Sequence, residues 1–383
     1  MSLFYGILKS KGLVLKGLQK TLDLHMLKQK DNKVDNYSLR SSPLIKGKVV
    51  DLKKAISEIN RILRTSSSIH IDGMDCDISS IDKALRFAEK KKCSINHKSY
   101  EKINNLYIAF QKFGGSLVSF NELKNRSDFV LLLGGDDISV FHEFVEKLKW
   151  NKNKVKKSIF FVGSGKAKDK TVYNMVDSKN ENIFHDINSI YVKLNEKKIN
   201  KEDRLYKIIS SILNSKYPTV VVNINEHNLA LMLCIYDFVY SVNKSIRLKI
   251  FNFFGSDNVS GFINACVTKT GFPNAVVFTE KGPQYEPYQI KSSILKENIE
   301  LQMYISNFEN NPKIDYFKKN IFIGNPNLKK KNSFDVYIPS QTPGVDKNGI
   351  MVHSDGISII KLNKLIDSPY KSVEEILTKV MRS

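Results

Sequence analysis

Short apolar runs that end abruptly in glycine or a small polar residue recur along this chain and limit how it can fold. Each run is apolar throughout, as in a strand buried on both faces of a sheet. The predicted strands cover residues 67–71, 128–133, 158–162, 219–224, 248–254 and 320–323. The segments with helical spacing of apolar residues cover 50–64, 78–91, 103–113, 140–148, 205–213 and 228–241. This alternation predicts an α/β fold with parallel sheets covered by helices.

The number of predicted strands is too large for one small sheet. We therefore expect two doubly wound parallel-sheet domains, and 383 residues leave room for two or three domains. Asp51 lies at the start of the first predicted helix and is expected to cap it. The carboxyl ends of the strands are where doubly wound folds open their ligand crevice.

The net charge of +21 permits two interpretations. Taken alone, it predicts a polyanion or nucleic acid as partner. However, Lys, Asn and Ile are all abundant, as an AT-rich genome would produce, and the lysines are scattered, with short runs at 90–92 and 329–331. A solvated basic surface is the favoured interpretation.

The cysteines and the hydropathy indicate a cytoplasmic protein. The four cysteines, Cys76, Cys93, Cys234 and Cys266, form no C-x-x-C pair and are expected to be free thiols in a reducing compartment. No apolar run reaches the roughly 18–20 residues that a membrane span needs. Residues 1–24 are apolar and basic but lack an unbroken hydrophobic core and a small-residue cleavage site, so we do not expect a signal peptide.

The first 45 residues are expected to form an amino-terminal arm and linker. Apolar residues within 1–30 recur at roughly helical spacing, with lysines between them. Such a segment can lie on a membrane surface. Packing on a partner or on the chain's own domain is the favoured alternative.

No motif in the sequence identifies a catalytic group. V-G-S-G-K-A-K at 162–168 lacks the spacing and the Ser or Thr of a phosphate-binding loop, so a tight turn is favoured. Asp136 and Asp137 follow a buried strand and either bind a metal or, as favoured, cap the next helix. The histidines form no metal-binding motif, and G-x-S-x-G is absent.

Four stretches, taken together, resemble the B-type subunit of formylmethanofuran dehydrogenase, a branch of the molybdopterin oxidoreductases. They are I-D-G-M-D-C-D-I-S-S-I-D-K-A-L-R-F-A at 71–88, F-N-E-L-K-N-R-S-D-F-V-L-L-L-G-G-D at 120–136, T-G-F-P-N-A-V-V-F with P-Q-Y-E-P at 270–278 and 283–287, and D-V-Y-I-P-S-Q-T-P-G-V-D-K-N-G-I-M-V-H-S-D-G at 335–356. Their order and spacing match the family over roughly residues 46–366.

The sequence departs from the redox members of that family at their metal ligands. Those members carry an amino-terminal cysteine cluster for a 4Fe–4S centre, which needs thiolate ligands. The first cysteine here is Cys76, so residues 1–45 contain none. The family's Cys or selenocysteine ligand to molybdenum or tungsten is also missing, because residues 96–105 read N-H-K-S-Y-E-K-I-N-N. We therefore expect neither molybdopterin or tungstopterin nor an iron–sulfur cluster, and no catalytic residue or metal site.

This pattern is similar to the bacterial relatives that belong to a formyltransferase/hydrolase complex of methylotrophs. There a formyl group passes from tetrahydromethanopterin to a furan-type carrier and is hydrolysed to formate. The resemblance implies a non-catalytic structural subunit whose partners are an amidohydrolase-like, a formyltransferase and a C-type subunit. It also implies that the carrier's polyglutamate tail could meet the basic surface. The alternatives are an oxidoreductase subunit whose cofactor ligands come from a partner, and a basic polyanion-binding protein.

The resemblance also implies one domain inserted in the other. Residues 46–98 and 207–383 would form the discontinuous domain, and 99–206 the inserted one. The ancestral cofactor pocket would lie at the strand ends and in the loop after residue 339. Its candidate residues, for which no cofactor is expected, are Gly134, Gly135, Gly163, Ser164, Gly255, Thr342 and Gly344.

Overall fold

The computed structural model of the chain describes residues 41–134, 141–149, 155–163, 174–177, 183–196, 200–223, 227–254, 258–287, 298–315 and 317–382. Most of the predicted amino-terminal arm, the Asp136–Asp137 pair and residues 164–168 of V-G-S-G-K-A-K lie outside these ranges.

The described residues form two compact units. The first unit takes its residues from Met1–Glu101, Ser256–His353 and Ile359–Ser383. The second takes them from Lys102–Gly255 and Ser354–Ser358.

A nine-stranded sheet forms the centre of the first unit. Its strands, in spatial order, are β11 (Gly282–Tyr285), β10 (Val276–Thr279), β4 (Ser94–Ile95), β3 (Ile69–Asp75), β12 (Leu301–Ser306), β13 (Lys319–Gly324), β14 (Val336–Pro339), β1 (Leu44–Ile45) and β2 (Lys48–Val49). The five neighbouring strands β4, β3, β12, β13 and β14 are parallel to one another. On each side, two further strands follow, each antiparallel to the strand before it.

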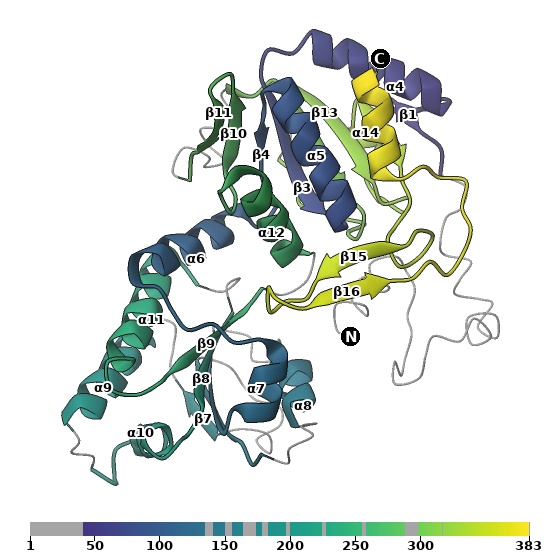
Figure 1. Cartoon of the computed structure of the whole chain (residues 1–383). Helices are drawn as coiled ribbons and strands as arrows, with labels where there is room; N and C mark the ends of the chain where they lie inside the picture. Colours follow the sequence, from purple (N-terminus) through teal and green to yellow (C-terminus); the bar gives the residue numbers. More distant parts are fainter. Residues whose placement is uncertain are drawn as a thin grey trace. The chain divides into compact units, whose positions relative to one another are not determined.

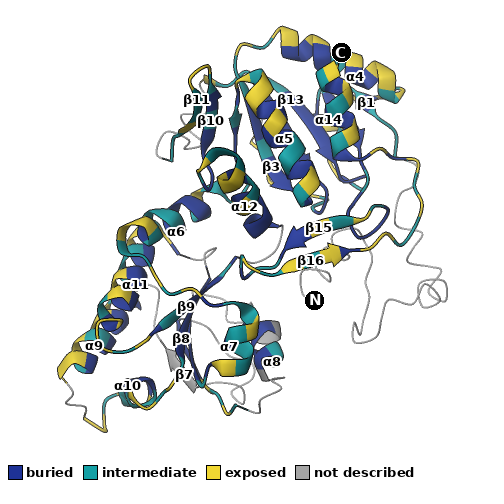
Figure 2. Ribbon diagram, in the orientation of Figure 1, coloured by how far each residue is buried: buried dark blue, intermediate teal, exposed yellow. Residues whose placement is uncertain are grey.

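Helices cover one face of this sheet. They are α4 (Leu52–Arg64), α5 (Ile78–Lys91), α12 (Val259–Thr270) and α14 (Val373–Arg382) (Figure 1). Alternate strand residues such as Met303 and Ile321 share one apolar core with these helices. The intervening residues Tyr304 and Phe322 face the other side and pack with Phe334 from the segment after β13. Figure 2 shows buried central strands and exposed outer helix faces.

Local sequence explains where two of these helices begin. The Asp51 side chain accepts a hydrogen bond from the Lys54 amide at 2.7 Å, so the predicted cap of α4 is confirmed. Asp77 caps α5 in the same way, accepting from the Ser80 amide at 3.3 Å. Both caps satisfy amides that the first helical turn leaves without an intrahelical acceptor.

The second unit contains a five-stranded sheet that is parallel throughout. The order is β7 (Asn174–Asp177), β6 (Ser158–Gly163), β5 (Phe129–Leu133), β8 (Pro218–Asn223) and β9 (Lys249–Phe253). Its helices are α6 (Tyr100–Phe113), α7 (Phe120–Arg126), α8 (His142–Lys149), α9 (Ile183–Glu196), α10 (Tyr206–Leu213) and α11 (Leu229–Val242). In Figure 1, α7 and α8 lie on one side of the sheet and α9, α10 and α11 on the other.

A two-stranded antiparallel ribbon completes the first unit. It consists of β15 (Gly349–Val352) and β16 (Ile359–Leu362). Met351 and Leu362 lie on its buried face and pack on Phe308.

The domain boundary differs from the predicted one. The second unit extends to Gly255, whereas the prediction ended the inserted domain at residue 206. The reason is strand pairing, because β8 pairs with β5 in parallel and β9 pairs with β8. Residues 207–255 therefore complete the second sheet, not the first.

Candidate functional site

Four parallel strands of the first unit end side by side. The register places Asp75 beside Ser306, Ser306 beside Gly324, and Gly324 beside Pro339. These residues mark the carboxyl edge of the sheet, where α/β folds bind their ligands. The side chains at this edge therefore form the candidate site.

A bulge in β3 directs one carboxylate into the edge. Ile305 pairs with Gly73 and Ser306 with Asp75, so Met74 is an additional residue. Gly73 and Met74 both have positive φ values, of 87° and 57°. The fully buried Asp75 then accepts from Ser306 Oγ at 2.9 Å and lies 3.6 Å from Lys98 Nζ.

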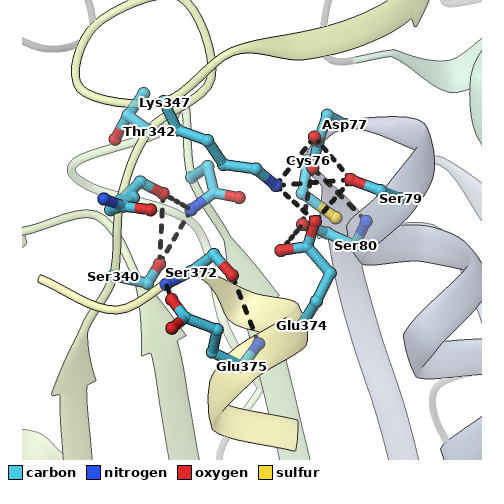
Figure 3. A network of polar contacts seen from close by, with 12 residues as sticks. Cys76, Asp77, Ser79, Ser80, Ser340, Thr342, Lys347, Ser372, Glu374 and Glu375 are labelled. Carbon is cyan, nitrogen blue, oxygen red and sulfur yellow. Dashed lines mark hydrogen bonds and ion pairs between the residues drawn. The ribbon is translucent and has the colours of Figure 1, made fainter. Parts of the chain in front are cut away.

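A lysine joins the loop after β14 to the first turns of two helices (Figure 3). Lys347 Nζ lies 2.9 Å from Asp77 Oδ2 at the start of α5 and also binds Glu374 in α14. Ser79 and Ser80 donate hydrogen bonds to Asp77 and Glu374. We call these five residues the Lys347 cluster.

Charge pairing within the Lys347 cluster outweighs its burial. Burial by itself would raise the pKa of Glu374, but the charge and hydrogen bond of Lys347 lower that pKa to about 2. Burial would likewise lower the pKa of Lys347, whereas Asp77 and Glu374 raise it above its usual value. Glu374 and Lys347 are therefore both charged at neutral pH, and Lys347 pairs with Glu374 and with Asp77.

The loop that contains Thr342 and Gly344 folds back on itself. The amides of Val345 and Asp346 donate to the Thr342 carbonyl at 3.0 and 3.2 Å, and the Gly344 amide donates to the Lys347 carbonyl at 2.8 Å. Gly344 has a φ of 78°, which suits glycine in this turn. The Thr342 side chain is fully buried.

Asn307 ties this loop to the sheet. Its Nδ2 donates to Ser340 Oγ at 2.9 Å and to the Gln341 carbonyl at 2.8 Å. Asn307 Oδ1 and Thr342 Oγ1 find no hydrogen-bond partner among the described residues and expose almost no surface. These two atoms are therefore not accessible from outside in this arrangement of the loop.

In the second unit, two predicted pocket glycines make room for a ring. A Cβ atom on Gly134 would lie 2.4 Å from Phe161 Cε2, and one on Gly163 would lie 2.6 Å from Phe161 Cζ. Phe161 is fully buried. The space beside both glycines is thus occupied by a core side chain. Gly135, Ser164 and Gly255 lie outside the described residues.

Sequence reasoning missed the Lys347 cluster. Asp77 carried a signal, because Asp directly before a segment with helical spacing of apolar residues is typical of a helix start. Lys347 and Glu374 carried none, since they lie hundreds of residues from Asp77 and only folding brings them together.

The cysteines do not fit an iron–sulfur cluster or a thiolate ligand to molybdenum. Cys76, Cys93 and Cys266 are buried. Burial raises the pKa of Cys93 and of Cys266 to about 12, and burial together with Asp77 and Asp75 raises that of Cys76 well above its usual value. The pKa of Cys234 is also raised, mainly by burial and to a smaller extent by the negative charge of Asp237. Burial therefore keeps these thiols in their neutral form. In the described part of the chain they also belong to no group of three or more His, Cys, Asp and Glu placed to hold a metal ion.

The described part of the chain contains neither a clustered metal site nor a membrane span. There, no group of three or more His, Cys, Asp and Glu side chains is placed to hold a metal ion. None of the helices described is both long enough and apolar enough to cross a membrane.

Comparison with known proteins identifies the fold. No protein-family model and no curated protein matches the sequence. Among solved structures, the chain is similar to a chain of the formyltransferase/hydrolase complex from Methylorubrum extorquens, solved in complex with methylofuran, with a TM-score of 0.76 at 12% identity. The match covers 89% of this chain and 98% of that one.

Another similar structure is acetylene hydratase from Pelobacter acetylenicus, a molybdopterin-type enzyme, with a TM-score of 0.58 at 10% identity. The match covers 91% of this chain but 63% of the hydratase, so this chain spans less than two thirds of it. The chain thus has a mixed α/β fold with parallel sheets that is similar to the folds of these two structures. The predicted α/β class is thereby confirmed, and both matches fit the predicted family without establishing membership.

Proposed function

We propose that this chain is a non-catalytic structural subunit of a formyltransferase/hydrolase complex. That complex would transfer the formyl group and hydrolyse it to formate, as the last part of tetrahydromethanopterin-linked one-carbon (formaldehyde) oxidation. Its partners would be an amidohydrolase-like, a formyltransferase and a C-type subunit. The observation that carries the proposal is the fold match to a chain of such a complex, which covers nearly the whole of both chains.

The paired side chains at the carboxyl edge of the first unit support a structural role. At this edge Lys347 pairs with Asp77 and Glu374, and Lys98 pairs with Asp75 and Glu309. The loop after β14 is tied to the sheet through Asn307. An enzyme keeps chemically active groups accessible to a substrate. The described groups at this edge instead fasten a loop to two helices.

Purification from the native cells tests the partners. A tagged copy of this chain at its native level should co-purify with the amidohydrolase-like and formyltransferase-like subunits in constant ratio. The isolated complex should transfer and hydrolyse the formyl group, and the chain alone should do neither. A chain that purifies without these subunits would contradict the proposal.

Metal and pterin analysis of the same complex tests the non-catalytic role. We expect neither molybdenum nor tungsten in stoichiometric amount, and no pterin released on denaturation. One equivalent of either metal with a pterin would favour the alternative oxidoreductase, with cofactor ligands from a partner. Parallel analysis of a known molybdopterin enzyme controls for loss of metal during purification.

A further inference from the structure

The strand β2 leaves a sheet edge open to solvent. It is the last strand of the nine-stranded order, and both of its residues, Lys48 and Val49, are exposed. Val49 is 71% exposed, which is unusual for a β-branched apolar residue in a strand. The Val50 amide donates to Pro43 at 3.0 Å, so the alternation of an antiparallel pair turns the N–H and C=O of Val49 outward.

Two segments that carry lysines lie side by side at this edge, the turn between β1 and β2 and the segment before β14. Lys46 forms the turn between β1 and β2, and its amide donates to the Asp335 carbonyl at 2.9 Å. A Cβ on the next residue, Gly47, would lie 3.8 Å from Asn332, which directly follows a run of three lysines. We call the set the lysine edge: Lys46, Lys48, Lys329, Lys330 and Lys331.

In the described part of the chain, the lysines of this edge are not engaged in close ion pairs. Within the described residues, no salt bridge joins any of its five lysines to an acidic side chain. Glu58 is held by both Arg61 nitrogens, at 2.7 and 2.8 Å. Asp335 Oδ2 accepts from the Asn320 amide at 2.8 Å. Glu58 interacts first with Arg61 and more weakly with Lys46, and neither Glu58 nor Asp335 forms a salt bridge with a lysine of the edge among the described residues.

We infer that the lysine edge is a docking surface for an acidic, extended segment of a partner protein, which pairs along β2. An open edge supplies backbone groups to an added strand. Lysines on an edge strand repel basic or identical strands and so prevent aggregation. The same charges attract a Glu- or Asp-rich strand, so the edge selects its partner by charge.

Other occupants fit less well. The chain's own first 40 residues contain seven Lys and one Arg against three Asp, so their charge has the wrong sign. Single-stranded nucleic acid binds where exposed aromatic side chains accompany basic ones. The large exposed apolar side chain on this edge is Val49, and the neighbouring rings of Phe334 and Tyr337 are buried.

The inference deepens the proposed function and rests on it for the kind of partner, an acidic segment of another protein in the complex. The test uses a fluorescent deca-glutamate peptide and the purified full chain. Binding is followed by anisotropy at low and at moderate salt, and a deca-glutamine peptide and a short single-stranded oligonucleotide serve as ligand controls. We expect the glutamate peptide to bind best, and more weakly at the higher salt.

Two matched variants locate the site. Changing Lys329, Lys330 and Lys331 together to Gln should weaken binding at least about fivefold, because each exposed pair contributes a fraction of a kcal/mol. The control changes Lys90, Lys91 and Lys92 to Gln, which removes the same charge from the end of α5, and should weaken binding less than about twofold. Val49→Pro removes the outward N–H and should also weaken binding, while thermal melting verifies that each variant is folded.

Three results would overturn the inference: equal losses in the two triple variants, tighter binding of the oligonucleotide, or unchanged binding by Val49→Pro. The results for the lysine edge and for the proposed function can be told apart. If the complex assembles but the peptide does not bind, only the lysine edge is misassigned. If the peptide binds but no complex forms, only the proposed function fails.

Discussion

At the scale of single residues, Asp72 shows how burial raises the pKa of a carboxyl group. This carboxyl lies in β3, accepts from the Gly73 amide at 2.7 Å and is partly buried. Burial raises its pKa to about 6, the charge of Asp315 adds to this, and the Gly73 hydrogen bond and Lys98 oppose it. The charged form is thus less stable in the folded than in the unfolded chain.

We predict that Asp72→Asn stabilises the protein at high pH only. The folded-state pKa is raised, so the wild type loses stability as pH rises from about 4 to about 6 and stays lower above that. The amide keeps an acceptor for Gly73 and removes the charge. Urea unfolding should show a gain of about 1–3 kcal/mol at about pH 8 and little at about pH 4. A gain of equal size at both pH values would refute this account of Asp72.

At the scale of elements, the bulge in β3 depends on one glycine. A Cβ on Gly73 would lie 2.6 Å from the Ile305 carbonyl oxygen, and its φ of 87° disfavours any side chain. Gly73→Ala should therefore cost about 3 kcal/mol or more. Gly271 is the matched control, because its φ is 82° but its Cβ would meet nothing within 4 Å.

For Gly271→Ala we expect a cost of about 1 kcal/mol, measured by denaturant unfolding alongside Gly73→Ala. The difference between the two variants isolates the collision with β12 from the cost of the backbone conformation. If the two costs were the same, β12 would not constrain the bulge.

The Lys347 cluster makes a second prediction for an element, the loop after β14. Lys347→Met leaves Asp77 and Glu374 without their cation and should cost about 2–4 kcal/mol. Lys364→Met is the control, because Lys364 pairs with an Asp367 side chain that is 94% exposed. That pair should be worth less than about 0.5 kcal/mol.

The stabilisation by Glu374 should also depend on pH. Its folded-state pKa is lowered from 4.5 to about 2. The stabilisation is complete above about pH 4.5 and is lost as pH falls toward 2. The difference between wild type and Lys347→Met in urea unfolding should therefore shrink on acidification. A difference that stays constant from about pH 7 to about pH 3 would contradict the ion pair.

At the scale of the whole molecule, strand pairing predicts which fragment folds. Residues 102–255 contain all five strands of the second sheet and its core, so this fragment should unfold cooperatively by itself. Residues 99–206 lack β8 and β9 and should not, because β5 would lose its neighbour. Thermal melting followed by circular dichroism compares the two. Cooperative melting of the shorter fragment would restore the predicted boundary.

The sequence alone was sufficient for features that depend on neighbouring residues. Apolar runs ending in glycine predicted the α/β class, and Asp51 before an apolar helical pattern predicted a cap. It could not reveal which sheet a strand joins, because 219–224 is apolar enough for either. Nor could it show that Gly134 and Gly163 make room for Phe161, since glycine beside a strand end is equally typical of a phosphate-binding loop.

The loop at 340–349 separates the two kinds of information most clearly. Its Pro, Gly and Asp residues are of the kinds that favour a tight turn, because turn chemistry acts over a few residues. What the turn does was decided by tertiary structure. Only folding brings Lys347 to Asp77 and Glu374, and Asn307 to Ser340. A buried charge is stable only with a partner, and here that partner comes from a distant part of the chain.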